Sequence, residues 1–436
     1  MASTYLQRTF TAGNRKTFTM SAWVKLAFTS NSNNIVIFNA DTDSGVDHDA
    51  LRFTTTNQLQ FFSYNGSFQC QLITNRVFRD TSSWYHVVVS VDTTQATSSD
   101  RVKMYINGVQ ETSFSTETYP SPNYDFTEFN NASHNLEVGA RARLSEQYFD
   151  GSMAHVHWID GAAYDASAFG QTDSASGIWK PKTAPSVTYG TNGFFLDFAN
   201  SSDLGNDVSG NNNDLTLSGS GTQTLDTPSN VFATLNPLAF ENAGSSVQMK
   251  NGNLRWDGGS SGAHNLSIGT LAVSQGKYYA EFKLGAVGGS YPQVGIRSVD
   301  VNNTLAEYVG QITGGVGYYS NGGIAVDGSN VSTGLTTYTT GDIIGVGLDL
   351  DGNKIYFYKN GTLVNTGGTS ITNRTYTFAV SQYQNTGHWL INFGNGYFGT
   401  TPVSTPESDS AGLGKFEYSV PSGYYALCTK NIAEYG

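Results

Sequence analysis

The chain carries one acidic loop whose side chains suit a calcium ion. Four aspartates, Asp41, Asp43, Asp47 and Asp49, lie within the segment DTDSGVDHD. Ca²⁺ prefers hard oxygen ligands, and carboxylates at this close spacing can supply several of them. The segment is therefore a candidate metal site, and Ca²⁺ is the one cofactor that the residues suggest.

A second candidate loop lies in the segment DVSGNNND, where Asp207 and Asp214 flank Asn211 and Asn213. These side chains also offer oxygens at close spacing. Neither loop has the ligand order of an EF-hand, and clustered Asp and Asn are equally the residues of a solvated turn. Metal site and turn both stay open for the two loops.

The residues that would serve catalysis do not form a familiar set. No Gly-x-Ser-x-Gly segment lies between a strand and a helix. His155 and His157 share a strand face, yet no third metal ligand is near, so a structural pair is favoured. Asp349 and Asp351 are spaced like a glycosidase pair, but the following Gly-Asn favours a turn. We predict that the chain is not an enzyme.

Tyrosines beside Gly- and Asn-rich turns are the candidates for binding an organic ligand. They are Tyr291, Tyr318, Tyr319 and Tyr383. Loops on a rigid sandwich usually carry the binding residues, and a sugar ring can stack on a tyrosine while Asn or Asp binds its hydroxyls. The tryptophans in strand-like segments are instead expected in the core, and they are Trp23, Trp84, Trp158 and Trp389.

Strands that alternate apolar and polar residues must position these loops. Two pairs of segments predict antiparallel hairpins ending in Asn-Gly: WYHVVVSVD (84–92) with RVKMYINGVQ (101–110), and GDIIGVGLDL (341–350) with DGNKIYFYKNGTL (351–363). LQFFSYNGSF (59–68) also closes on Asn-Gly. Many such short strands predict an all-β fold of two antiparallel, jelly-roll-like β-sandwich domains.

The length, charge and apolar content of the chain limit the kinds of partner that it is expected to have. A length of 436 residues favours two domains, and a formal net charge of −12 disfavours nucleic acid. The apolar runs are only strand-sized, which disfavours membrane insertion. The N-terminus lacks a secretory pattern, so we expect synthesis in the cytoplasm. Cys70 and Cys428 are expected to be free buried thiols.

Two families are recognisable in these segments. Residues 1–165 resemble the laminin-G-like, concanavalin A-like sandwich, through YLQRTFTAGNRKTFTMSAWVKL, the 84–110 hairpin and LEVGARARLSEQYFDGSMAHVHWIDGAAY. This resemblance implies Ca²⁺ at the sandwich rim. Residues 236–436 resemble a SPRY domain, through KYYAEFKL, PQVGIRSV, GDIIGVGLDLDGNKIYFYKNG and INFGNGYF in that order. Residues 166–235 form a Gly/Ser/Asn-rich connector with short strands.

The connector also resembles a segment of tailed-bacteriophage structural proteins, through its WKPK, YGTNGFFLDF and DVSGNNND stretches. This resemblance implies a virion surface protein, as a fibre, tail tip or capsid decoration, that adheres to a host glycan or envelope receptor. Other virion proteins and a homo-oligomer, with a trimer favoured, are the implied partners. A non-adhesive cement protein and a polysaccharide depolymerase are the alternatives.

Overall fold

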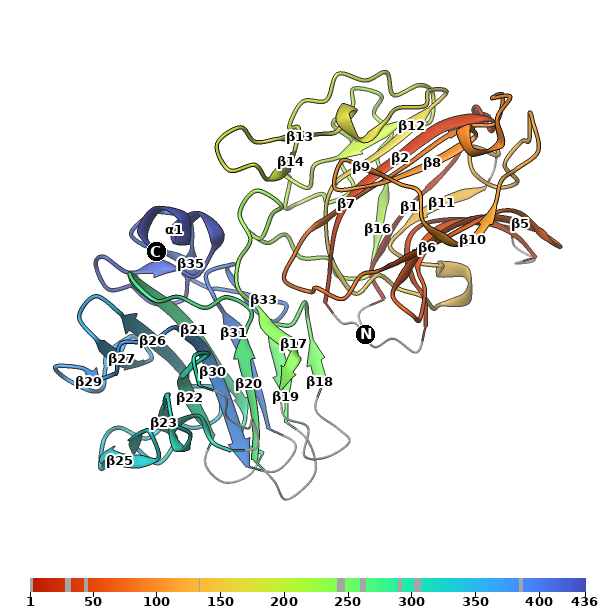
Figure 1. Cartoon of the computed structure of the whole chain (residues 1–436). Coiled ribbons are helices and arrows are strands. Elements are labelled where there is room, and N and C mark those ends of the chain that lie inside the picture. Colours follow the sequence, from red (N-terminus) through yellow and green to blue (C-terminus); the bar gives the residue numbers. More distant parts are fainter. Residues whose placement is uncertain are drawn as a thin grey trace. The chain divides into compact units, whose positions relative to one another are not determined.

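The computed structural model describes residues 3–27, 33–42, 46–132, 134–240, 248–258, 264–288, 292–301, 307–383 and 387–436. Asp43 and Tyr291 lie outside the described residues. The chain divides into two compact units, Met1–Gln223 and Thr224–Gly436. Each unit is built of antiparallel sheets (Figure 1), so the prediction of an all-β fold is confirmed.

The first unit packs one sheet against another around a single core. The first sheet has the order β10 (Phe114–Thr118), β6 (Phe68–Val77), β5 (Gln58–Asn65), β4 (Asp47–Phe53), β3 (Ile35–Asp41), β11 (Asn135–Val138), β1 (Tyr5–Thr9), β16 (Thr216–Ser218). The second has the order β15 (Phe194–Leu196), β12 (Gly151–Asp160), β2 (Thr17–Leu26), β7 (Tyr85–Asp92), β8 (Val102–Ile106), β9 (Val109–Glu111). Phe18, Phe38 and Trp158 are fully buried between them.

The segment expected to be a connector is divided between the two units. Its β15 pairs with β12 and its β16 pairs with β1, so both strands extend the sheets of the first sandwich. A small hairpin, β13 (Gly170–Thr172) with β14 (Trp179–Pro181), precedes them, and Trp179 packs in a cluster with Val88 on β7. Residues 166–223 thus belong to the first unit and 224–235 to the second.

The second unit is also built from two sheets. One has the order β17 (Leu235–Phe240), β20 (His264–Gly269), β30 (Tyr376–Tyr383), β22 (Gln293–Ser298), β23 (Gly315–Tyr319), β24 (Ile324–Val326), β25 (Ser329–Ser332). The other runs β18 (Gln248–Lys250), β19 (Arg255–Asp257), β31 (His388–Asn392), β21 (Lys277–Ala286), β26 (Ile343–Asp349), β27 (Lys354–Lys359), β28 (Thr362–Leu363). Trp256, Trp389 and Phe282 are fully buried in the core.

Short elements complete the two units. In the second unit β29 (Thr369–Ser370) pairs with β27, β36 (Tyr425–Ala426) with β21, β32 (Tyr397–Phe398) with β33 (Thr401–Pro402), and β34 (Glu407–Ser408) with β35 (Lys415–Phe416). The helical turns are η1 (Ser98–Asp100), η2 (Ala142–Leu144), η3 (Ala166–Ala168) and η4 (Val309–Gln311), and the α-helix is α1 (Thr429–Tyr435). Among the described residues, no helix is long and apolar enough to span a membrane.

The hairpins follow the predicted alternation of side chains. Along β8 Val102, Met104 and Ile106 are buried, while Lys103 and Tyr105 are only half-buried. The turn after β8 has Asn107 at φ 50° and Gly108 at φ 84°, as the tight Asn-Gly hairpin turn requires. The predicted Trp and Cys positions are confirmed as well: Trp23, Trp84, Trp158, Trp389, Cys70 and Cys428 are all buried, and both cysteines are free.

A buried carboxylate fastens the C-terminal segment to the second unit. Asp409 accepts hydrogen bonds from the backbone N–H groups of Leu413, Gly414 and Ala426, at 2.7, 3.0 and 2.8 Å. The side-chain amide of Asn431 donates to the same carboxylate at 2.8 Å. Since a buried backbone N–H needs an acceptor, this one side chain organises the closing segment.

We therefore expect Asp409→Ala to lower the free energy of unfolding by about 3 kcal/mol, because it leaves several buried N–H donors without an acceptor. Chemical denaturation followed by tryptophan fluorescence measures this. Glu407→Ala, at an exposed position on the neighbouring strand, is the matched control and should change stability little. Equal effects of the two substitutions would contradict this role of Asp409.

Candidate ligand-binding site

A pocket of about 330 Å³ opens on the second unit beside β23, β24 and β25. Its lining side chains are Tyr308, Gln311, Tyr319, Asn321, Asn330 and Thr333, and Gly323, Gly328 and Gly334 complete its wall. The volume is at the lower end of the range for ligand pockets, which suits a small ligand or one or two sugar residues.

Turns at the strand ends shape this pocket. Tyr319 ends β23, and its N–H bonds the carbonyl of Gly323 at 2.8 Å across a turn in which Gly322 has φ +87°. Between β24 and β25 the chain turns through Asp327 and Gly328, at φ 49° and 83°. The N–H of Gly328 then donates to the carbonyl of Gly310 in η4 at 3.0 Å. These bonds hold the floor and the rim of the pocket together.

The floor of the pocket is aromatic and its rim carries amides and a hydroxyl. The rings of Tyr308 and Tyr319 lie 6.2 Å apart between centroids, and Tyr319 is only 8% exposed. Burial raises the pKa of Tyr319, although hydrogen bonds with Gln293 and Gln311 act against this rise, so the phenol is neutral at physiological pH.

The rim groups can bind a neutral polar ligand. Gln311, Asn321, Asn330 and Thr333 are exposed there, and none of the residues that line the pocket is charged. The side-chain oxygen of Asn321 accepts a bond from the N–H of Gly323 at 3.2 Å. An amide offers both donors and acceptors, which matches the hydroxyl groups of a sugar or the amide groups of a peptide.

The structure places the tyrosines predicted to bind a ligand in different environments. Tyr319 lines the pocket, whereas its neighbour Tyr318 is fully buried on the opposite face of β23. The Tyr318 ring packs 5.2 Å from Phe357 between centroids, and its hydroxyl donates to the carbonyl of Thr336. Tyr318 is therefore a core residue and not a ligand contact. Tyr383 is half-buried at the end of β30 and does not line the pocket.

Most of the pocket cannot be recognised from the sequence alone. Tyr308 and the rim amides are brought together only when η4 packs against the end of β23. The Asn-Gly-Gly and Asp-Gly turns of 321–323 and 327–328 were the signal that could have indicated them.

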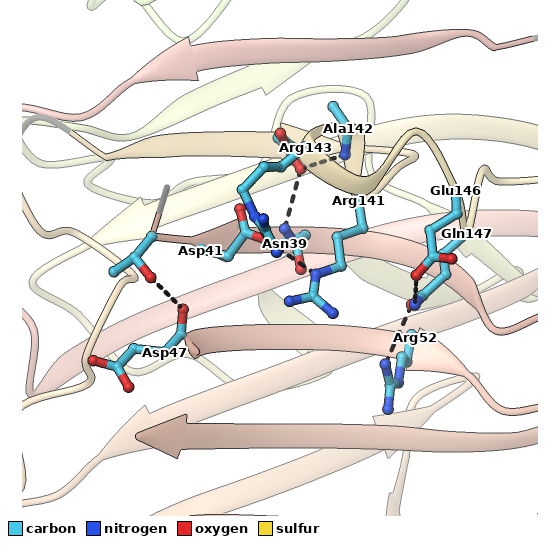
Figure 2. Close-up of polar contacts among 11 residues, drawn as sticks. Asn39, Asp41, Asp47, Arg52, Arg141, Ala142, Arg143, Glu146 and Gln147 are labelled. Atoms are coloured by element: carbon cyan, nitrogen blue, oxygen red, sulfur yellow. Dashed lines mark hydrogen bonds and ion pairs between the residues drawn. The ribbon is translucent and has the colours of Figure 1, made fainter. Parts of the chain in front are cut away.

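Among the described residues of the first acidic loop, Asp41 and Asp47 have separate partners (Figure 2). Asp41 pairs with Arg141 and Arg143, with N–O distances of 3.0 and 3.2 Å. On β4, His48 stands opposite Asp41. The next residue, Asp49, therefore points to the other face of the sheet, where it is fully buried. It accepts bonds from the N–H groups of Glu128 and Phe129 at 2.7 and 2.9 Å.

The carboxylate of Asp41 is thus already balanced by two guanidinium groups, and that of Asp49 is already bonded inside the sandwich. Asp47 lies half-buried at the start of β4, where its carbonyl accepts the N–H of Thr42 at 3.1 Å. Asp43 is outside the described residues. These contacts favour a structural loop over a calcium site.

The second acidic loop binds its own backbone. Asp207 accepts bonds from the N–H groups of Phe195, Ser209 and Asn213, each at 2.8 Å. Asp214 accepts the N–H of Asp207 at 2.9 Å. Within the described part of the chain, no group of three or more acidic, histidine or cysteine side chains is arranged to hold a metal ion.

The two histidines of β12, which were considered as a metal pair, both stack on Phe195. His157 is buried, stacks on Phe195 with centroids 4.1 Å apart and bonds the Tyr189 hydroxyl at 3.0 Å. His155 lies in a bulge of β12 at φ 46°.

The carboxylate pair at the β26–β27 turn is structural as well. Asp349 accepts the N–H of Gly352 at 2.7 Å and pairs with Lys277 at 3.0 Å. Asp351 accepts the N–H of Gly276 at 2.9 Å. The prediction of a turn at these aspartates is confirmed.

Comparison with known families agrees with this architecture. Residues 2–167 match the model of the concanavalin A-like lectin/glucanases superfamily, and residues 277–394 match that of the SPRY domain. The chain therefore contains a concanavalin A-like domain followed by a SPRY domain, as the sequence segments indicated. None of the curated proteins matches the chain significantly.

The solved structures that match parts of this chain include two of different origin. The SPRY domain of human HERC1 is 18% identical over 36% of this chain and 96% of that one, with a TM-score of 0.31. A native heptameric SAP-like pentraxin from Limulus polyphemus is 14% identical over 37% of this chain and 72% of that one, with a TM-score of 0.28.

A buried carboxylate of the first unit makes its stability depend on pH. Glu137 accepts bonds from the side-chain amide of Asn39 at 3.1 Å and from the N–H of Ala142 at 2.9 Å, both through one oxygen. Burial raises its pKa from 4.5 to about 7. Its stabilising contribution is therefore fully present below the unfolded-state pKa and is lost as the pH rises through about 7.

We expect the side-chain oxygen of the glutamine in Glu137→Gln to accept both hydrogen bonds, while the side chain no longer ionises. The variant should gain roughly 2 kcal/mol in unfolding free energy relative to the parent protein between about pH 5 and pH 8. Denaturant titrations across this pH range measure the difference. A difference that stays constant across the range would contradict the raised pKa of Glu137.

Proposed function

We propose that this protein is a non-catalytic binding protein that recognises a neutral carbohydrate in the pocket of its SPRY domain. The observation that carries the proposal is the composition of this pocket, with a floor of Tyr308 and Tyr319 and an uncharged rim of amides and a hydroxyl. A tyrosine face offers apolar area to a sugar ring at low conformational cost, and adaptable polar side chains bind its hydroxyls.

The charged residue beside Gly328 in the pocket wall is Asp327, and its side chain already has a hydrogen-bond donor. Asp327 accepts the N–H of Gly314. A neutral ligand therefore fits the pocket better than an ionic one, because a charged group would enter it without a counterion.

The biological setting that we propose is attachment of a tailed bacteriophage to its host. The resemblance of the WKPK, YGTNGFFLDF and DVSGNNND stretches to phage structural proteins supports it. The protein would lie on the virion surface, as a fibre, tail tip or decoration component, in a homo-oligomer that we expect to be a trimer. Several copies of a shallow pocket would then raise a modest single-site affinity through multivalency.

Removing one rim amide tests the pocket directly. We expect Asn330→Ala to weaken binding of a neutral oligosaccharide, selected from a glycan array, by about three- to tenfold, which corresponds to one lost hydrogen bond. Isothermal titration calorimetry measures it. Asn373→Ala, at an exposed position of the same unit, is the matched control and should bind like the parent protein.

Other outcomes would reject the proposal. Absence of binding to every neutral glycan, or equal affinity of the two variants, would contradict a role for this pocket. Release of new reducing ends from a polysaccharide would indicate a depolymerase. Binding only to virions that lack this protein would indicate a cement protein.

A further inference from the structure

The first unit presents a second surface, on the side of its β4–β5–β6 sheet that faces away from the core. Phe61 on β5 lies in the core, so the alternation of the strand turns Gln60, Phe62 and Tyr64 to the other side. Arg52 on β4 stands opposite Gln60, and Phe68 on β6 stands opposite Tyr64. We call Arg52, Phe62, Tyr64 and Phe68 the Arg52 platform.

The Arg52 platform is a continuous row that runs from a charged end to an apolar end. The Arg52 guanidinium carbon lies 4.6 Å from the centre of the Phe62 ring. Phe62 packs edge-on against Phe68 with centroids 5.7 Å apart, and Phe68 against Tyr64 at 5.1 Å. Phe62 is fully buried in the middle of the row, whereas Phe68 at its end is 43% exposed although it is a large apolar ring.

The guanidinium of Arg52 is held by neutral acceptors. It donates to the side-chain oxygen of Gln60 at 2.9 Å and to that of Gln147 at 3.2 Å. Figure 2 shows Gln147 and Glu146 beside it. The oxygen of Glu146 accepts a bond from the side-chain amide of Gln147 at 2.9 Å. These two bonds fix the orientation of the Arg52 guanidinium. Among the described residues, no carboxylate is bonded to it.

Two further guanidinium groups stand near this end of the platform. Arg141 and Arg143 both pair with Asp41. Next to Asp41, Glu137 has a pKa raised to about 7, so it carries only part of a negative charge at neutral pH. Burial, reinforced by Arg141, Arg52 and Arg143, lowers the pKa of His48 to about 3. Arg141, Arg52 and Arg143 therefore lie close enough to His48 to disfavour its protonated form.

We propose that the Arg52 platform binds an acidic saccharide, with a uronate carboxylate on the Arg52 guanidinium and the next sugar ring on Phe68. The planar fork of Arg matches a carboxylate with two parallel hydrogen bonds. A partly buried guanidinium also gains more from an anion than an exposed one would. This inference goes beyond the carbohydrate site of the SPRY domain, because it concerns the other unit and an acidic ligand instead of a neutral one.

Calorimetry with one pair of ligands tests the inference on the full chain. The probe is a hexasaccharide of alternating uronic acid and N-acetylhexosamine, and its carboxyl-reduced form is the neutral control ligand. We expect binding of the acidic form only, weaker at high salt than at low salt. Arg52→Gln should reduce the affinity at least about tenfold, as loss of a charged hydrogen-bonded pair does.

Three more variants separate loss of binding from effects of folding, net charge and the SPRY pocket. Phe68→Ala, at a position 43% exposed, should weaken binding several-fold with only a small decrease in melting temperature. Lys103→Gln removes an equal charge from β8 in the opposite sheet and should bind like the parent protein. Asn330→Ala in the SPRY pocket should also leave acidic binding unchanged, so failure of one site is distinguishable from failure of the other.

Three results would overturn the inference. They are equal affinity for the acidic and the carboxyl-reduced hexasaccharide, equal loss of affinity in Arg52→Gln and Lys103→Gln, and no binding of the acidic form at low salt. Self-association that Phe68→Ala abolishes in sedimentation would show instead that a second copy covers this platform.

Discussion

The requirement that each sheet bury one face against another sheet determines the rest of this structure. Alternation along every strand sends one set of side chains into a core, such as Val102, Met104 and Ile106 on β8, and turns the other set outward. Polar groups with ligand-binding potential can then occur at the strand ends or on the outward faces. The two surfaces that we propose as binding sites illustrate these two possibilities, at the ends of β23–β25 and on the face of β4–β6.

The same requirement explains the use of the acidic residues. A loop that closes a sandwich has backbone N–H groups without strand partners, and a carboxylate can accept several of them at once. Asp49, Asp207 and Asp409 do this for three different loops. Clusters of aspartate in such a chain are therefore a weak indicator of metal binding, because most of their oxygens already have partners within the fold.

Local patterns predicted the fold well. The Asn-Gly turns and the alternation of β8 required only neighbouring residues, and both are confirmed. The sites were harder to predict, because their members are distant in the sequence. Tyr318 and Tyr319 are equally close to a turn, and only the pairing of β23 with β22 and β24 decides which one enters the core. The pairing of Asp41 with Arg141 likewise crosses from β3 to a loop after β11, which the sequence alone did not indicate.

The neutral-sugar site that we propose lies at the end of β23 in the SPRY domain. A crystal structure of the full chain with its tightest-binding neutral oligosaccharide would show whether the sugar occupies it. We expect electron density for a sugar ring over Tyr319, with its hydroxyls within hydrogen-bond distance of Asn330 and Gln311. A well-bound saccharide at another position, with this pocket left to solvent, would contradict this proposal.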